Sequence, residues 1–347
     1  MAATASNSLA SDLLRISPIT QGAAHLLALL FGICYVGSLY VSNKARLKFE
    51  ANAKTIDDKY PRAKLAHERW RDDPDVMRAR VTAVSIASIL CCLGVVALVW
   101  WRSDLEVELS NLGPVLYLSC SYLGFKWDFP SDFNWSSWSD ISALGPHVVV
   151  PVLFLGPLYA TYLDGTLPGQ QFWSLDEHVF DKYFSLMGLR TYILGPITEE
   201  IVFRSCVLTA FHMAHMSRKQ MVFLTPLTFG VAHAHHAWDT YNRYGRTQAA
   251  LKRALIGCAM QLTYTSIFGF LAAYLFVQTG SVLPAITAHI FCNTMGFPEL
   301  AYELQKFPHR KKEILFAYLL GMAGFVYVLP KWTEVGLERR GAVWGSV

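Results

Sequence analysis

The chain has 347 residues, of which 53% are hydrophobic, 14% aromatic and only 16% charged. Soluble proteins carry roughly 25% charged residues, so this composition excludes an ordinary soluble protein. The net charge of +4 is too small for a polybasic nucleic-acid binder, and most Lys and Arg residues fall between apolar stretches. We therefore expect an all-α, polytopic protein whose partner is the lipid bilayer and not a nucleic acid.

Apolar runs of about 18 residues or more recur along the chain, and each can cross a hydrocarbon core of roughly 30 Å as a helix. We expect about eight transmembrane helices, with a shorter apolar piece at 112–125 as a re-entrant segment. The expected spans cover 21–42, 81–101, 147–162, 190–215, 220–237, 253–277, 281–297 and 313–330.

The domain organisation is expected to be simple, because no internal repeat or low-complexity tract is found. Residues 1–18 read as a flexible tail, 19–335 as a single multi-span domain with its catalytic core at about 187–300, and 336–347 as a C-terminal tail. The first apolar run continues into Lys44, Arg46 and Lys48, which favours a retained span over a cleaved signal peptide.

Charge bias predicts the side of the membrane on which the first connections lie. The connection 43–80 is rich in Lys and Arg and is expected in the cytosol. The connection 102–146 has few basic residues and many aromatic ones, and it contains the sequon Asn134-Trp135-Ser136. We expect this second connection in the lumen.

The chain has seven cysteines, nearly all inside apolar segments and without metal-ligand spacing, which argues against a disulfide framework. They are Cys34, Cys91, Cys92, Cys120, Cys206, Cys258 and Cys292. A thiol nucleophile at Cys206 or Cys292 is disfavoured, because neither has a neighbouring cation that would lower its pKa. Both are interpreted as small buried apolar residues.

The expected span 190–215 carries Glu199, Glu200 and Arg204, although a charge at the bilayer centre costs roughly 2.5–3.5 kcal/mol. Glu200 and Arg204 are four residues apart, so they lie on one helical face and can neutralise each other. Glu199 lies about 100° around the helix and faces another surface, where it can act as a general base. Gly195 and Pro196 are expected to start or kink this helix.

Two further expected spans contribute polar side chains. In 220–237, His233 shares a helical face with Phe229 and is the natural proton carrier, whereas His235 and His236 read as interfacial or packing residues. In 281–297, His289 and Asn293 project from one face, and both can donate hydrogen bonds to a developing oxyanion. Together these groups could add water to an amide bond.

These residues resemble those of a known family, the type II CAAX prenyl endopeptidases, also called Ras-converting endopeptidases. The resemblance rests on Glu-Glu-x-x-x-Arg at 199–204, Phe-x-x-x-His at 229–233 and His-x-x-x-Asn at 289–293, which occur in the family's order. The N-terminal spans and the long hydrophilic connection resemble the eukaryotic branch of the family.

The resemblance implies an eight-helix fold with an intramembrane cavity, in the endoplasmic reticulum membrane, with a site open to the cytosol. It implies removal of the last three residues from farnesylated or geranylgeranylated CAAX proteins, such as Ras-like small GTPases. Carried over by position, Glu199 and His233 would activate water, and His289 with Asn293 would hold the oxyanion. Glu200 and Arg204 would support them, and no cofactor or metal is implied.

Three alternatives use the same residues. A zinc protease could bind its metal through Glu199, His233 and His289, with water in the fourth position. The other, metal-dependent class of CAAX protease is excluded because the chain has no His-Glu-x-x-His motif. A non-catalytic scaffold of the same fold would be expected to lack some of the six polar residues. A transporter could use them as a proton relay, but the expected pseudo-repeat is missing.

Overall fold

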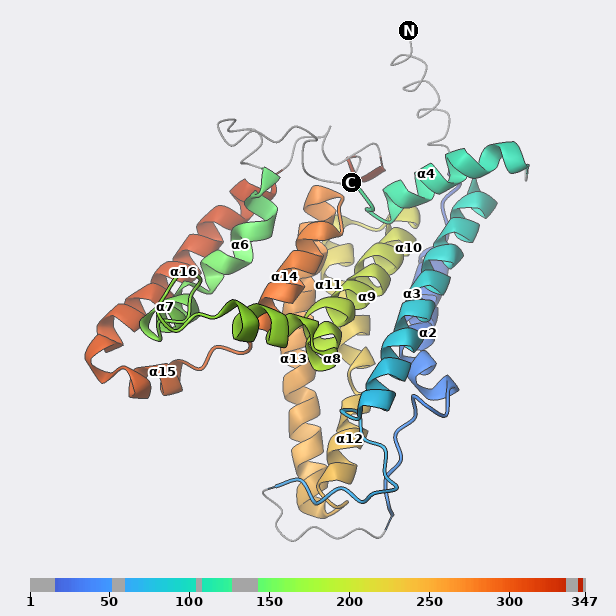
Figure 1. The fold of residues 1–347 in the computed structure, drawn as a ribbon. Helices are drawn as coiled ribbons and strands as arrows, with labels where there is room; N and C mark the ends of the chain where they lie inside the picture. Colours follow the sequence, from blue (N-terminus) through green and yellow to red (C-terminus); the bar gives the residue numbers. More distant parts are fainter. Residues whose placement is uncertain (1–15, 52–59, 104–107, 127–142, 335–342, 346–347) are drawn as a thin grey trace. The chain divides into compact units, whose positions relative to one another are not determined.

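The computed structural model describes residues 16–51, 60–103, 108–126, 143–334 and 343–345, and the regular secondary structure in these ranges is helical (Figure 1). Extended pairing in this part of the chain is limited to two isolated bridges, Ile16 with Ser103 and Lys48 with Arg69. The predicted all-α class is therefore confirmed for the described residues. The chain divides into two compact units, and each is described by itself.

The first unit combines 1–123 with 198–274. Its helices are α2 (Gln21–Val41), α3 (Pro74–Arg102), η1 (Leu109–Asn111), α4 (Leu112–Tyr122), η4 (Ile201–Cys206), α10 (Val207–Met213), α11 (Arg218–Ala232) and α12 (His235–Arg243). Two further helices lie partly in this unit: α9 (Gly195–Glu200) from residue 198 onward and the long helix α13 (Gln248–Thr279) up to residue 274.

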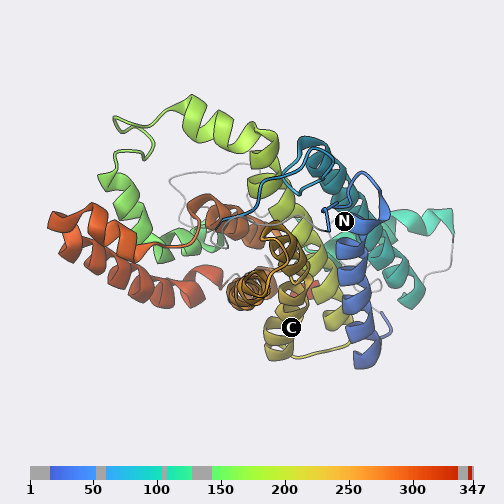
Figure 2. The same ribbon diagram turned by 90° about the horizontal axis from the view of Figure 1, so that it is seen from below.

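The core of the first unit lies where α2 and α3 pack against each other and against η4 and α10 (Figures 1 and 2). Local signals start these helices: the Thr20 side chain caps α2, Pro74 is the first residue of α3, and Ser217 with Gln220 forms a capping box on α11. These caps satisfy backbone N–H groups that a helix leaves unpaired at its start.

The second unit combines 124–197 with 275–346. Its helices are α6 (Gly145–Leu153), α7 (Leu155–Leu163), η2 (Asp176–Phe184), α8 (Leu186–Gly188), η3 (Leu189–Leu194), α14 (Leu283–Met295), α15 (Leu300–Lys306), η5 (Pro308–Arg310) and α16 (Lys311–Thr333). Helix α16 packs on α6 and α7. A Cβ atom at Gly156 would lie 2.1 Å from the Tyr318 ring, so only glycine permits this close approach.

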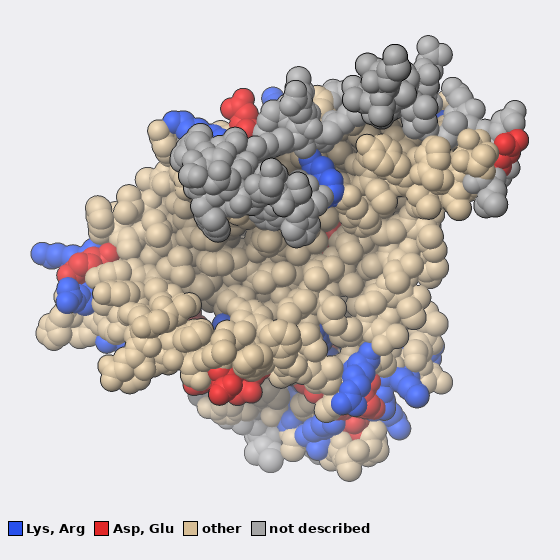
Figure 3. All heavy atoms as spheres, turned by 45° about the horizontal axis from the view of Figure 1, so that its top comes forward, with Lys and Arg blue, Asp and Glu red and all other residues tan. Residues whose placement is uncertain are grey.

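Within the described residues, four helices are long and apolar enough to cross a membrane: α2, α3, α13 and the helix over 308–333. The pair α6 and α7 would add a fifth span, although it bends by 67° at Phe154. The other expected spans are shorter as single helices, since α11 has 15 residues and α14 has 13. Figure 3 shows mainly uncharged side chains on the face seen there, with Lys, Arg, Asp and Glu gathered near its edges.

Some sequence predictions fall outside the described residues. These are most of the N-terminal tail at 1–18, the sequon at Asn134, and 335–342 with 346–347 of the C-terminal tail. The described part of that tail is packed: Trp344 is 1% exposed and its ring meets the Phe276 ring edge to face, with centroids 4.9 Å apart. Part of the expected C-terminal tail therefore contributes to the core of the second unit.

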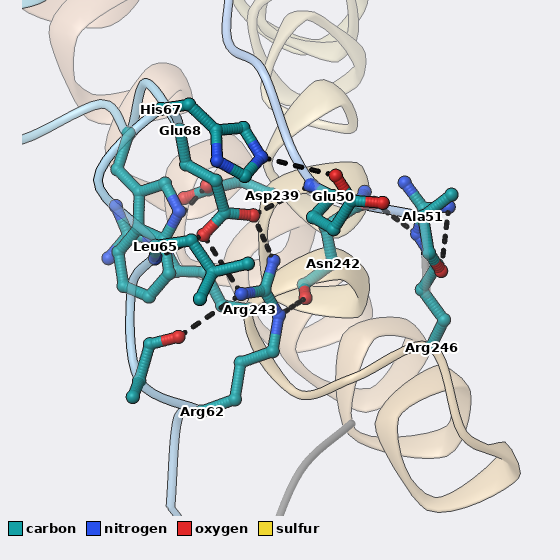
Figure 4. A network of polar contacts seen from close by, with 12 residues as sticks. Glu50, Ala51, Arg62, Leu65, His67, Glu68, Asp239, Asn242, Arg243 and Arg246 are labelled. Atoms are coloured by element: carbon teal, nitrogen blue, oxygen red, sulfur yellow. Dashed lines mark hydrogen bonds and ion pairs between the residues drawn. The ribbon is translucent and has the colours of Figure 1, made fainter. Parts of the chain in front are cut away.

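The basic connection between α2 and α3 is tied to α12 by Arg62 (Figure 4). The Arg62 backbone N–H donates to the Arg243 carbonyl at 2.9 Å, and its Nε donates to the Asn242 carbonyl at 3.2 Å. The same guanidinium pairs with the buried Glu68 carboxylate, which also accepts hydrogen bonds from the backbone N–H groups of Glu50 and Leu65. The connection therefore has a defined fold on the end of α12.

This arrangement makes the connection sensitive to acid. The hydrogen bond from Arg62 holds the pKa of the Glu68 carboxyl at about 2, below its ordinary value of 4.5. A carboxyl whose pKa is lowered by folding stabilises the fold. This stabilisation is complete when the pH is above the ordinary pKa, and it is lost as the pH falls toward the pKa of the folded state. We predict that the Glu50 and Leu65 amides lose protection from deuterium exchange as the pH falls from about 4.5 toward 2.

In Glu68→Gln these two amides should be weakly protected already at neutral pH and change little on acidification. The Lys48 amide, which donates to the Arg69 carbonyl at 2.9 Å, is the internal control. Equal protection of the Glu50 and Leu65 amides in wild type at both ends of that pH window would contradict the prediction.

Candidate active site

The predicted acidic motif lies on one helical run from Leu186 to Met213, built from α8, η3, α9, η4 and α10. The segments 189–194 and 201–206 are π-helical, and they flank the short α-helix that ends at Glu200. Single π-helical turns are rare in proteins and are frequent at functional sites. At Gly195 and Pro196, where the sequence predicts a start or kink of the helix, the helix changes from π-helical to α-helical.

Glu200 and Arg204 form the ion pair that their four-residue spacing predicts. The Arg204 Nε and Glu200 Oε2 atoms are 3.0 Å apart, and the side chains are 1% and 0% exposed. The Arg204 guanidinium carbon lies 4.3 Å from the ring centroid of Phe229 and 5.6 Å from that of Phe268. The rings attract the cation through their faces, so α11 and α13 help to hold a charge that water does not reach.

Glu199 lies on a different surface and is half-buried. Its carboxylate is close enough to Tyr35, Arg204 and Tyr264 to interact electrostatically with each of them. The preceding residue is fixed from two sides: Tyr35 Oη and Thr198 Oγ1 are 2.9 Å apart, and Ser88 Oγ donates to the Thr198 carbonyl at 3.4 Å. Helices α2 and α3 therefore position the backbone from which Glu199 projects.

His233 follows the last residue of α11, and its orientation is defined. Its Nδ1 donates to the Phe229 carbonyl at 2.8 Å, because a carbonyl oxygen can only accept. In the neutral ring the other nitrogen, Nε2, is then an acceptor. The ring also contacts Phe229 edge to face, with centroids 4.7 Å apart. The His233 side chain is thus held with a basic nitrogen pointing away from its own helix.

His289 and Asn293 lie on α14 in the second unit, whereas Glu199, Glu200, Arg204 and His233 belong to the first. His289 is buried, with 7% exposure. The Asn293 Nδ2 donates one hydrogen to the Thr191 carbonyl at 2.9 Å, which fixes the amide against η3. An amide nitrogen carries two hydrogens, so the second can still serve as a donor.

Two groups of residues near the motif were missed by sequence reasoning. Tyr35 and Thr198 gave no signal, since a single tyrosine or threonine in an apolar helix is ordinary. Arg46, Arg71 and Arg80 line a cavity beside α12, yet their positions were interpreted only as a sign of cytosolic topology. The cation-rich stretch Tyr60–Arg80 was the signal that could have suggested a binding site.

These features define an integral membrane protein with a buried carboxylate–guanidinium pair, a second carboxylate beside it and an oriented histidine. A family model described as "Type II CAAX prenyl endopeptidase Rce1-like" matches residues 181–295, the part that carries all of the predicted site residues. No solved structure matches the chain.

Curated relatives agree with the family model. Human CAAX prenyl protease 2 is 32% identical over 269 residues, covering 76% of this chain and 74% of the relative. The Caenorhabditis elegans CAAX prenyl protease 2 is 35% identical over 204 residues, covering 55% and 70%. A probable CAAX prenyl protease 2 of Schizosaccharomyces pombe is 29% identical over 276 residues, covering 80% and 82%. The chain belongs to the type II CAAX prenyl endopeptidase family and is a membrane protease.

The buried ion pair generates a stability prediction. Removing one partner of a buried pair leaves an uncompensated charge and typically costs 3–5 kcal/mol, whereas replacing both by apolar groups is often close to neutral. We predict that Arg204→Met lowers the free energy of unfolding by about 3–5 kcal/mol. The double variant Glu200→Leu with Arg204→Met should recover most of that loss, as measured by denaturation of the chain in detergent.

The matched control is the exposed helical pair Arg310 and Glu313, whose Nη1 and Oε1 atoms are 3.3 Å apart. Arg310→Met should change the free energy of unfolding by less than about 1 kcal/mol, as is usual for exposed pairs. Similar effects of Arg204→Met and Arg310→Met would show that the buried pair has no special role.

Proposed function

We propose that this chain hydrolyses the peptide bond that follows the prenylated cysteine of CAAX proteins, releasing the C-terminal tripeptide. Glu199 takes a proton from water, and the water oxygen attacks the scissile carbonyl carbon. His233 orients the water through Nε2, and the proton then passes to the departing amine. Glu200 and Arg204 are positioning residues that act through the helix carrying Glu199.

The observation that carries these roles is the fixed tautomer of His233. The bond from His233 Nδ1 to the Phe229 carbonyl leaves Nε2 as an acceptor for a water hydrogen. The pairing of Glu200 with Arg204 supports a structural role for Glu200. The half-buried Glu199, on another surface of the same helix, is then the proposed general base.

The second part of the proposal assigns the oxyanion donors to His289 and Asn293. Support comes from the family motif and from the fixed amide of Asn293, whose second hydrogen can reach another acceptor. An oxyanion donor is effective when it is held in place before the reaction, because no reorganisation is then required. The bond from Asn293 to the Thr191 carbonyl supplies such a restraint.

The family also supports a wider setting. We propose eight membrane segments around an intramembrane cavity, with α11 and α14 and their extensions supplying spans that are short as single helices. The protein would reside in the endoplasmic reticulum membrane with its site open to the cytosol, consistent with the basic connection next to α12. Its substrates would be farnesylated or geranylgeranylated proteins such as Ras-like small GTPases.

The proposed roles of Glu199 and His233 can be tested by substitution. A general base typically contributes 10²–10⁴-fold, so Glu199→Gln should lower kcat for a farnesylated CAAX peptide by at least about 100-fold. His233→Ala leaves the attacking water without its orienting acceptor and should lower kcat by a similar factor, about 100-fold. The measurement uses the purified full chain in detergent or nanodiscs. Glu177→Gln, at an exposed position on η2, is the matched control and should retain the wild-type rate.

Wild-type rates in both Glu199→Gln and His233→Ala would refute the proposed mechanism. The same assay distinguishes the zinc alternative. Activity that persists after exhaustive chelation supports water activation by Glu199 and His233. Activity lost on chelation and restored only by zinc would instead make Glu199, His233 and His289 metal ligands.

The oxyanion role of Asn293 has its own test. Removing one oxyanion donor typically costs about 10²–10³ in kcat, so Asn293→Ala should lower kcat by about 100-fold or more with little change in KM. Thr294→Val is the control on the same helix, because it removes the 3.0 Å bond from Tyr183 Oη but no proposed donor. Equal loss of kcat in the two variants would reduce Asn293 to a packing role.

A further inference from the structure

A cationic cavity of about 210 Å³ lies in the first unit beside α12. It is formed where the end of α2, the start of α3 and the first turn of α12 meet. Three arginines and one aspartate line it, together with two histidines, two aromatic residues and one leucine: Tyr40, Arg46, Leu47, Arg71, Arg80, His235, His236, Trp238 and Asp239. Charge and shape thus suit a small anion with an apolar neighbour.

The acidic groups near this cavity, Asp72 and Asp239, are paired with Arg243 outside it, and Asp72 is also paired with Arg71 in its lining. Arg243 donates from Nε to Asp239 at 3.0 Å and from Nη2 to Asp72 at 2.8 Å. Arg243 is not part of the cavity lining. The Arg71 Nε also lies 3.5 Å from Asp72 Oδ1. The three lining arginines and Arg243 outnumber Asp72 and Asp239, so the net charge around the cavity is positive.

Two of the three arginines, Arg80 and Arg71, have defined polar contacts, whereas Arg46 is exposed. Arg80 is 9% exposed and its Nε donates to the Ala45 carbonyl at 2.9 Å. The Arg71 Nη1 lies 3.5 Å from His236 Nδ1, which accepts because arginine has only donors. His236 then carries its hydrogen on Nε2 and can donate to an anion. A preorganised set of donors binds an oxyanion without a large loss of side-chain entropy.

The histidine wall of the cavity continues to the proposed reaction centre. The rings of His235 and His236 are tilted by 42° with centroids 4.1 Å apart, and the His236 and His233 centroids are 5.9 Å apart. In an extended peptide each residue spans about 3.3–3.6 Å, so three residues after the scissile bond reach about 10 Å. That length is sufficient to extend from His233 past His236 into the cavity.

We propose that this cavity binds the free C-terminal carboxylate of the substrate, with Arg71 as a main contact. The inference rests on the proposed function and deepens it, since it explains how a protease could measure three residues from the end of a chain. The carboxylate would bind the arginine donors, and Tyr40, Leu47 and Trp238 would contact the last side chain. Recognition of the chain end would select a terminal tripeptide over an internal peptide bond.

The test compares two farnesylated CAAX peptides that differ only at the end, one a free acid and the other its carboxamide. A hydrogen bond to a charged group contributes enough for about 10- to 100-fold in affinity. For wild type we expect kcat/KM for the acid to exceed that for the amide by about this factor. Arg71→Gln should cleave the two peptides at similar rates, while Arg71→Lys should retain part of the preference for the acid.

Arg78→Gln is the matched control, because Arg78 is an exposed arginine of α3 that does not line the cavity. It should keep the wild-type preference. Equal cleavage of acid and amide by wild type would overturn the carboxylate proposal while leaving the protease function intact. Failure of wild type to cleave either peptide would overturn the proposed function and the carboxylate site together.

An anionic lipid headgroup has the same oxyanion chemistry, and nanodiscs distinguish it from the substrate. Each enzyme is assayed in phosphatidylcholine alone and with phosphatidylserine added. A preference for the acid that is equal in both lipids supports the substrate carboxylate. If Arg71→Gln instead lowers both rates equally, and only when phosphatidylserine is present, the cavity is a lipid site and the proposal is wrong.

Discussion

The buried ion pair between Glu200 and Arg204 is the interaction on which the candidate site depends. Both charges are removed from water, so each requires the other, and Arg204 additionally lies against the ring of Phe229. Phe229 also accepts the hydrogen bond from His233 through its carbonyl. The charge that stabilises Glu200 is therefore packed on the same residue that orients the histidine, and the two parts of the site share one support.

This shared support explains why two adjacent glutamates have different surroundings. Glu200 is bound to Arg204, whereas Glu199 is half-buried and lies close enough to Tyr35 and Tyr264 to interact with them. The 2.9 Å contact between Tyr35 and Thr198 fixes the backbone just before it. A site assembled in this way tolerates ionised groups at membrane depth because each group has a named partner, which is the usual condition for polar residues in a bilayer.

Sequence periodicity and hydropathy predicted those features of the fold and site that depend only on residues close together in the chain. The four-residue spacing of Glu200 and Arg204 was enough to predict their pairing, and apolar length predicted α2, α3, α13 and α16. Hydropathy could not predict the bend of 67° between α6 and α7, because it measures how apolar a segment is and not the direction of its helix axis.

Sequence reasoning could not predict long-range contacts, because the local sequence around one residue does not indicate a partner far away in the chain. Tyr35 and Thr198 are 163 residues apart, and nothing in either local sequence indicates the other. The arginine-lined cavity likewise combines α2, α3 and α12. Its cations were visible in the sequence but were attributed to topology, because the positive-inside rule accounts for basic connections without any binding role.

The attachment of the α2–α3 connection to α12 has a consequence for how the chain is made. Arg62 and Glu68 are 6 residues apart and can meet as soon as both are synthesised, but Arg62 reaches its Asn242 carbonyl across 180 residues. The contacts of Arg62 with the Asn242 and Arg243 carbonyls can therefore form only after α12 has been synthesised. Attachment of this basic segment to α12 is thus a late event in biogenesis, and a chain arrested before residue 242 would lack the bond from Arg62 to the Asn242 carbonyl.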